Sequence, residues 1–81
     1  MNLVELTEFL VKSIVKEPDM ISVKEFEGNE EEITIQVLVD EKEMGSVIGR
    51  GGSIANSIRT IVQAAAYVNQ QKKVRINIDS F

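Results

Sequence analysis

The chain has 81 residues, a formal net charge of −4, and neither cysteine nor histidine. This length allows one small domain, and the two missing residue types exclude disulfide bonds, thiolate metal sites and the commonest general base. With no apolar run near the roughly 20 residues of a membrane span and no secretory signal, we expect residues 1–81 to form a single cytoplasmic domain without membrane contact, metal, cofactor or small-molecule substrate.

The N-terminal segment has the pattern of an amphipathic helix. Asn2 and Glu5 have the spacing of a capping box, in which each side chain accepts from the other residue's backbone amide. Apolar residues then recur at helical spacing, at Leu3, Leu6, Leu10 and Ile14. Because Pro18 cannot continue a helix, the pattern predicts a helix over residues 3–16.

Two strand patterns follow this helix. Ile21 and Val23 alternate with polar residues, and residues 33–39 carry an apolar side chain at every second position. Gly28 and Asn29 mark a turn between them, so we expect a hairpin with one buried face. The acidic run at residues 30–32 is more typical of a solvated loop than of a metal site, because three consecutive side chains point in different directions.

Two helices and a third strand complete the predicted fold. Asp40 and Glu43 repeat the capping-box spacing, and the short apolar helix that follows stops at Gly49. A second helix begins near Ser53, and residues 72–79 alternate as a strand. The order helix, strand, strand, helix, helix, strand predicts an α+β fold, in which helices cover one face of a three-stranded sheet.

The loop between the two central helices carries the clearest functional signal. Three of its four residues, 49–52, are glycine, which permits positive φ and removes the Cβ atoms that would hold a ligand's backbone away. The helix beginning at Ser53 directs its free amides and the positive end of its dipole at the loop. Arg50 adds a guanidinium suited to phosphate oxygens. These features together predict a site for a phosphodiester backbone.

The same glycines also allow other interpretations. Gly49 can simply end a helix, and the glycines after it can form a helix-helix turn, so a structural role stays open. Two further phosphate motifs fail on residue identity. A Walker loop that starts at Gly45 would need glycine at Arg50, and a dinucleotide-binding fingerprint that starts at Gly49 would need glycine at Ile54.

Charge is distributed unevenly along the chain. Residues 1–45 hold twelve acids and four lysines, whereas residues 46–81 hold five basic residues and one acid. The negative net charge argues against a nucleic-acid partner, but the basic half that contains the loop can attract a polyanion. The same asymmetry also fits acids and bases that are scattered over a solvated surface.

The segment Ile48-Gly49-Arg50-Gly51-Gly52 resembles the I-G-x-x-G segment of KH domains, whose loop holds the backbone of about four nucleotides of single-stranded RNA. The inferred order of elements is similar to the type II, prokaryotic KH arrangement. The whole chain resembles the stand-alone bacterial KhpA-like proteins, notably over residues 44–49, 58–62 and 73–79. This resemblance implies an RNA chaperone or post-transcriptional regulator, not an enzyme, with effects on cell shape and cell-wall homeostasis.

The resemblance also implies a set of RNA-binding residues. The loop would clamp phosphates, while Ile48 and Ile54 would border a groove for bases, a role that a place in the core does not exclude. Polar contacts would come from the first turn of the second central helix, and Arg59 would reach phosphate one turn later. The implied site residues are Ile48, Gly49, Arg50, Gly51, Gly52, Ser53, Ile54, Asn56 and Arg59.

The helix after the loop has a wider apolar face than one sheet requires. Its apolar positions span about 200° at 100° per residue, roughly twice the width needed. The excess edge, formed by Ile61, Ala64 and Val68, predicts a dimer interface, unless the helix is sunk more deeply between its neighbours. The resemblance implies a homodimer or a heteromer with a larger KhpB-like protein. An alternative for the whole chain is a protein-interaction adaptor with little RNA affinity.

Overall fold

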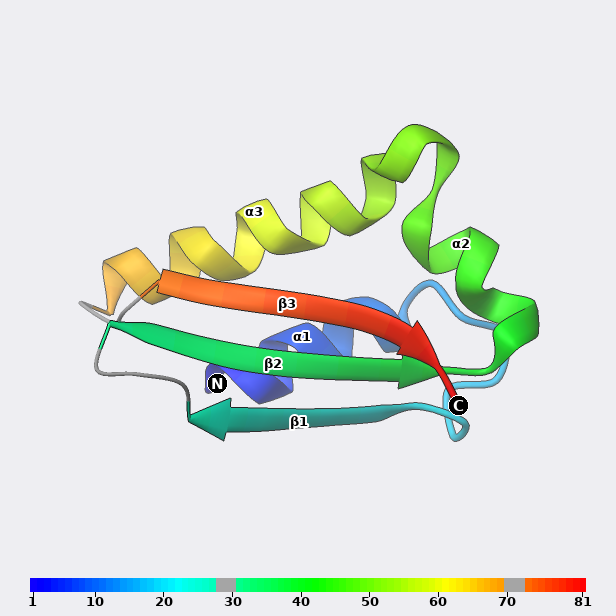
Figure 1. Cartoon of the computed structure of the whole chain (residues 1–81), viewed down its shortest axis with the longest axis horizontal. Coiled ribbons are helices and arrows are strands. Elements are labelled where there is room, and N and C mark those ends of the chain that lie inside the picture. The colour runs from blue at the N-terminus through cyan, green and yellow to red at the C-terminus, as the bar shows by residue number, and fades with distance from the viewer. Residues whose placement is uncertain (28–30, 70–72) are drawn as a thin grey trace.

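A computed structural model describes residues 1–27, 31–69 and 73–81 of the chain (Figure 1). Its elements, in order, are α1 (Leu3–Lys12), β1 (Ser22–Glu27), β2 (Glu32–Val39), the 3-10 turn η1 (Glu41–Glu43), α2 (Met44–Ile48), the 3-10 turn η2 (Arg50–Gly52), α3 (Ser53–Val68) and β3 (Lys73–Ser80). The predicted α+β fold and its order of helices and strands are therefore confirmed. The turn expected at Gly28-Asn29 and the first residue of the acidic run lie outside the described residues.

The three strands form one sheet in the order β1-β2-β3. β1 pairs antiparallel with β2, as a hairpin requires, and β3 pairs parallel with β2 after the crossover through α2 and α3. On the central strand Ile35, Val37 and Val39 are fully buried. Since side chains alternate between the faces of a strand, these residues define the covered face.

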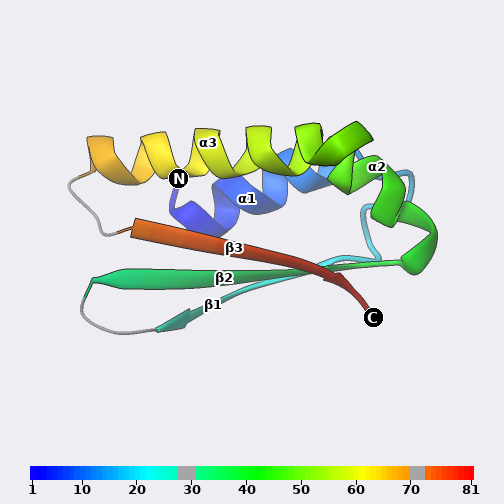
Figure 2. The ribbon, with the colours of Figure 1, turned by 45° about the horizontal axis from the view of Figure 1, so that its top comes forward.

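Helices α1 and α3 lie on that one face, and the opposite face carries no helix (Figure 2). The core is the layer between helices and sheet, and its fully buried members include Val11 of α1, Val47 of α2 and Val62 of α3. Each comes from an apolar position of the sequence pattern, so the apolar faces of these helices point into this core. Among the described residues, no helix is long and apolar enough to cross a membrane.

The first helix begins as predicted and ends earlier. The Asn2 side chain accepts from the Glu5 amide at 2.7 Å, and the Asn2 amide donates to the Glu5 carboxylate at 3.1 Å, so the capping box is present. The helix stops at Lys12 rather than at residue 16. Beyond Lys12 the backbone tightens, with the Ile14 amide donating to the Val11 carbonyl at 3.0 Å.

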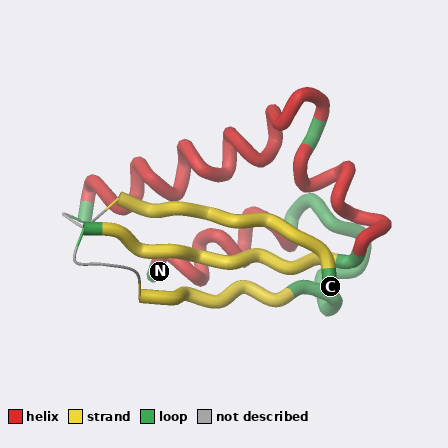
Figure 3. Tube along the Cα trace, viewed as in Figure 1, coloured by secondary structure: helices red, strands yellow, loops and turns green. Residues whose placement is uncertain are grey.

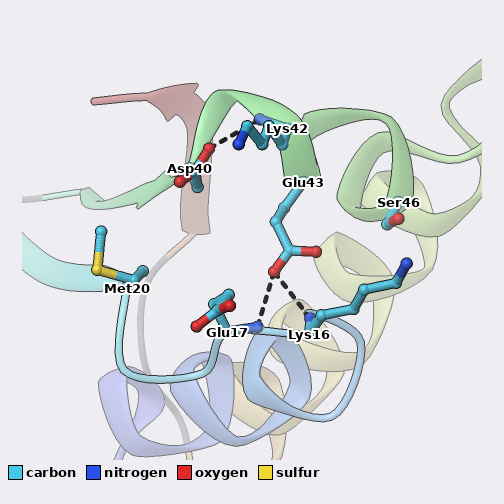
Figure 4. Close-up of a pocket in the computed structure, with 7 residues that line it drawn as sticks. All are labelled: Lys16, Glu17, Met20, Asp40, Lys42, Glu43 and Ser46. Atoms are coloured by element: carbon cyan, nitrogen blue, oxygen red, sulfur yellow. Dashed lines mark hydrogen bonds between the residues drawn. The ribbon is translucent and has the colours of Figure 1, made fainter.

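A buried carboxylate explains this early end. The Oε2 atom of Glu43 accepts from the amides of Lys16 and Glu17, at 2.8 and 2.9 Å (Figure 4). The second capping box is consequently wrong, because the Glu43 side chain serves the distant α1–β1 connection and is only 7% exposed. Asp40 still caps locally, since its side chain accepts from the Lys42 amide at 2.9 Å.

Candidate nucleic-acid interface

The glycine loop joins α2 to α3 at an outer corner of the molecule (Figure 3). Its three glycines all have positive φ, 78° at Gly49, 63° at Gly51 and 82° at Gly52. At Gly49 this φ is combined with a ψ of 173°, a region that is essentially restricted to glycine. The sharp bend between the two helices thus depends on the glycine pattern seen in the sequence.

The glycines differ in the space around them. A Cβ atom at Gly49 would lie 2.8 Å from the backbone nitrogen of Ile54 and 2.9 Å from its Cβ. At Gly51 an added Cβ would meet nothing within 4 Å, and at Gly52 it would lie 3.7 Å from the Asn56 side-chain nitrogen. Gly49 therefore packs the loop against α3, whereas Gly51 forms its open outer surface.

The start of α3 provides donors and positive potential at this surface. Gly52 occupies the N-cap position and makes no side-chain hydrogen bond to the first amides of α3. Of these amides, that of Ser53 donates to the Arg50 carbonyl of the preceding turn. Arg50 and Gly51 are exposed, and Arg50 forms no ion pair within the described part of the chain. An anion that approaches the loop meets a guanidinium and the positive end of a 16-residue helix together.

The apolar and polar neighbours of the loop are accessible to different degrees. Ile48 is half-buried and Ile54 is 36% exposed, so each has a packed side and a free side. Ser53 and Asn56 are exposed on the first turn of α3. The structure brings these four residues together around the loop, and their roles in RNA binding stay predictions.

Arg59 bridges the first turn of α3 and the sheet. Its Nε donates to the Ile76 carbonyl of β3 and its Nη1 to the Asn56 side-chain oxygen, both at 3.2 Å. This geometry fixes the guanidinium between α3 and the edge of β3. The predicted phosphate contact of Arg59 is untested, and here the side chain lies beside the groove described next.

A shallow groove of about 440 Å³ lies between α3 and β3. Its lining comprises Arg59, Thr60, Gln63, Ala64, Tyr67 and Val74. Gln63 closes the groove at the sheet, where its Oε1 accepts from the Val74 amide at 2.9 Å, while its Nε2 is buried without a partner in the described structure. Sequence reasoning missed Gln63 and Tyr67, although they follow Arg59 at intervals of four residues, which places all three on one helix face.

The predicted interface residues lie on the surface of α3. Ile61 is 46% exposed, Val68 is 82% exposed and Ala64 is exposed. Tyr67 beside them is 65% exposed. The alternative of a helix sunk between its neighbours is therefore wrong for this edge, and the apolar edge is free to contact another chain.

A second pocket, of about 510 Å³, lies at the α1–β1 connection (Figure 4). Its lining carries three carboxylates and two ammonium groups, and consists of Lys16, Glu17, Met20, Asp40, Lys42, Glu43 and Ser46. The excess of carboxylates makes this pocket a poor receptor for a polyanion. Among the described residues, no cluster of three or more acidic side chains has the arrangement of a metal site.

Comparisons with known proteins point to one family. A family model described as "KhpA/KhpB, KH domain" matches residues 4–78. RNA-binding protein KhpA from Clostridium perfringens is 45% identical over 74 residues, which cover 91% of this chain and 96% of that protein. RNA-binding protein KhpA from Borreliella burgdorferi is 36% identical over 77 residues, covering 95% and 92% of the two chains.

Solved structures share the fold at lower identity. A crystal structure of Aquifex aeolicus Era bound to GDP and AlF4⁻ superposes with a TM-score of 0.76 at 18% identity, covering 98% of this chain and 30% of Era. A crystal structure of Era in complex with MgGDPNP and nucleotides 1506–1542 of 16S ribosomal RNA gives a TM-score of 0.74 at 19% identity, with the same coverage. The present chain thus matches less than a third of Era, and this likeness concerns the fold alone.

Proposed function

The chain belongs to the KhpA/KhpB KH-domain family, and we propose that it binds single-stranded RNA by clamping the sugar-phosphate backbone on residues 49–52. The observation that carries the proposal is the open loop itself. Gly51 has free space around it, Arg50 is exposed beside it, and α3 begins there without a side-chain cap. The name of the relatives, RNA-binding protein, supports the same ligand.

The mechanism is binding without chemistry, since the KH family is a non-enzymatic one. Phosphate oxygens accept from the amides at the loop, and bases extend from the loop past Ile54 toward the groove beside Arg59. A clamp of this kind selects unpaired strands, because their bases can be splayed out of a stack. Ser53 and Asn56 on the first turn of α3 supply donors next to the clamp.

A double substitution in the loop tests the clamp. Arg50→Asp with Gly51→Asp places two carboxylates where the phosphates would pass and removes the guanidinium. The fold should persist, because a Cβ at Gly51 meets nothing within 4 Å and aspartate tolerates its left-handed backbone. We expect RNA affinity to fall below detection in fluorescence anisotropy with a 12-nucleotide RNA pool of random sequence.

A matched control distinguishes the effect of the loop from the effect of the overall net charge. Lys12→Asp with Ser13→Asp lowers the net charge equally at the exposed end of α1. This control should bind RNA within about threefold of the wild type. Unchanged affinity in the loop variant, or equal losses in both variants, would refute the clamp.

We propose further that α3 mediates a homodimer through Ile61, Ala64 and Val68. Their exposure supports this interface. A dimer would also raise the affinity for RNA, because a single four-nucleotide site on an acidic protein should bind weakly and a second, linked site adds avidity. Ile61→Asp should give a monomer in sedimentation equilibrium without loss of folding, because half of the side chain is already in solvent. The control is Thr60→Asp on the groove side, which should weaken RNA binding and leave the sedimentation mass unchanged.

The cellular part of the proposal rests on the family resemblance. It comprises a cytoplasmic RNA chaperone or post-transcriptional regulator, which works as a homodimer or with a larger KhpB-like protein and affects cell shape and cell-wall homeostasis. Crosslinking in cells, followed by sequencing of the bound RNA, tests the regulatory role and identifies the targets.

A protein-interaction adaptor is the second candidate function, favoured by the net charge of −4 and the exposed apolar edge of α3. Salt dependence separates the two functions. Each phosphate contact to a single strand contributes about −0.7 to the slope of log affinity against log salt. A slope near zero for RNA, with a salt-insensitive protein complex instead, would favour the adaptor.

A further inference from the structure

The face of the sheet opposite the helices has an unusual composition for so acidic a chain. Alternation along each strand, fixed by buried Ile35 and Val37, assigns the residues of this face. They are Ser22, Lys24 and Phe26 of β1, Glu32, Thr34, Gln36 and Leu38 of β2, and Lys73, Arg75, Asn77 and Asp79 of β3. We call this set the open sheet face, because it lies on the side of the sheet that carries no helix in Figure 2.

Two adjacent rows across the sheet combine an aromatic ring with basic residues. Phe26, Thr34 and Arg75 lie side by side in register. The neighbouring row of Lys24, Gln36 and Asn77 adds a lysine and two amides. Phe26 is 49% exposed, although a lone phenylalanine gains most by burial. These rows present stacking surface, hydrogen-bonding groups and cations together.

The charges of the open sheet face favour a polyanion. Lys24 and Lys73 form no ion pair within residues 1–27, 31–69 and 73–81. Arg75 donates to Glu32 at 2.8 Å, yet its side chain stays 60% exposed. The two acids of the face, Glu32 and Asp79, lie outside the two rows. The central rows therefore carry positive charge on a chain whose net charge is −4.

The open sheet face is continuous with the groove beside α3. β3 is an edge strand of the sheet, and Val74 lines the groove from its covered face. Lys73 and Arg75, the residues on either side of Val74, project to the open face. A strand that crosses the edge of β3 would pass directly from the groove to the guanidinium of Arg75.

We propose that the open sheet face is a second contact surface for the same single-stranded RNA, so that the bound segment extends beyond the loop and around the edge of β3. Phe26 would stack on a base, Gln36 and Asn77 would pair with base edges, and Lys24, Lys73 and Arg75 would contact phosphates. Aromatic stacking combined with cations is the usual way to hold an unpaired strand. This inference rests on the proposed function of the loop.

RNA length is the variable that tests the second surface. In ¹⁵N-¹H correlation spectra of the wild type, a 5-nucleotide random-sequence RNA should shift amides of residues 48–67 only. A 12-nucleotide RNA should also shift the amides of Lys24, Phe26 and Asn77. Shifts confined to residues 48–67 with both lengths would overturn the second surface and leave the clamp standing, whereas no shift with either RNA would overturn both.

A triple variant measures the contribution of the surface. Lys24→Gln, Phe26→Ser and Lys73→Gln together should weaken 12-nucleotide binding about tenfold, in line with the loss of one stacked base, and lower its salt slope by about 1.4. Binding of the 5-nucleotide RNA should not change. The matched control, called the α1 control, is Phe9→Ser with Lys12→Gln on α1 and Lys16→Gln just after it, which removes an exposed phenylalanine and two lysines.

Two results with these variants would refute the proposal that the open sheet face contacts RNA. One is an equal loss in the triple variant and the α1 control, because the effect would then be one of overall charge. The other is concentration-dependent association of the wild type that the triple variant abolishes in sedimentation. A second copy of the chain, not RNA, would in that case cover the open sheet face.

Discussion

Replacing Gly49 by alanine tests whether the loop is held by backbone geometry. The φ of 78° and ψ of 173° at this position lie in a region that costs an alanine about 1–3 kcal/mol. The new Cβ would also stand 2.8 Å from the backbone nitrogen of Ile54, an overlap that costs roughly another 1–3 kcal/mol. Alanine also lowers the conformational entropy of the unfolded chain, which offsets part of this cost. We therefore expect the free energy of unfolding to fall by about 3 kcal/mol.

Gly51→Ala provides the matched comparison. Its φ of 63° and ψ of 19° are left-handed, which costs about 1–2 kcal/mol for alanine, but the added Cβ meets nothing within 4 Å. The net loss should be about 1 kcal/mol or less. The two variants have the same chemistry and positive φ, so their difference isolates the contact with Ile54 and the glycine-only backbone region.

Urea unfolding monitored by helical circular dichroism gives both free energies. In thermal scans Gly49→Ala should lower Tm by roughly 12 °C or more, and Gly51→Ala by roughly 5 °C. Equal losses in the two variants would show that the close approach of Gly49 to Ile54 does not constrain the loop.

Two further substitutions address contacts remote from the loop. Glu43→Ala removes the acceptor of the Lys16 and Glu17 amides and should lower the free energy of unfolding in urea by about 3 kcal/mol. Glu43→Gln keeps an acceptor and should cost less than half of that. Equal losses in the two variants would mean that only side-chain packing matters. Asn2→Ala should cost about 1 kcal/mol, because the capping box with Glu5 is lost; a change below 0.3 kcal/mol would show that the box contributes little.

Most of the fold could be predicted because its signals are local. Apolar spacing located each helix and strand, and the glycines located the bend between α2 and α3. The family resemblance is confirmed by the match over residues 4–78. The end of α1 and the second capping box were predicted wrongly, because the Glu43 carboxylate accepts from the amides of Lys16 and Glu17, more than twenty residues away in sequence. No pattern within residues 3–16 could reveal that partner.

The candidate site, too, was predictable only where its features depend on local sequence. The loop and its exposure followed from residues 49–52, since positive φ and missing Cβ atoms are properties of glycine itself. The orientation of Arg59 did not follow, because it depends on where the β3 carbonyl of Ile76 lies after the crossover. Gln63 and Tyr67, which line the groove, had a signal in their four-residue spacing. The prediction of the site relied on charge and on glycine, and neither residue is basic or a glycine.

The Glu43 carboxylate also affects how the proposed RNA clamp is held in position. α2 has only five residues, too few to be stable as an isolated helix, so its placement must come from neighbours. Glu43 directly precedes it and anchors this start to the backbone at Lys16 and Glu17. Glu17→Pro removes one of these two amide donors at a position outside the loop. This replacement should therefore lower the affinity for RNA, because α2 and the loop would be held less rigidly.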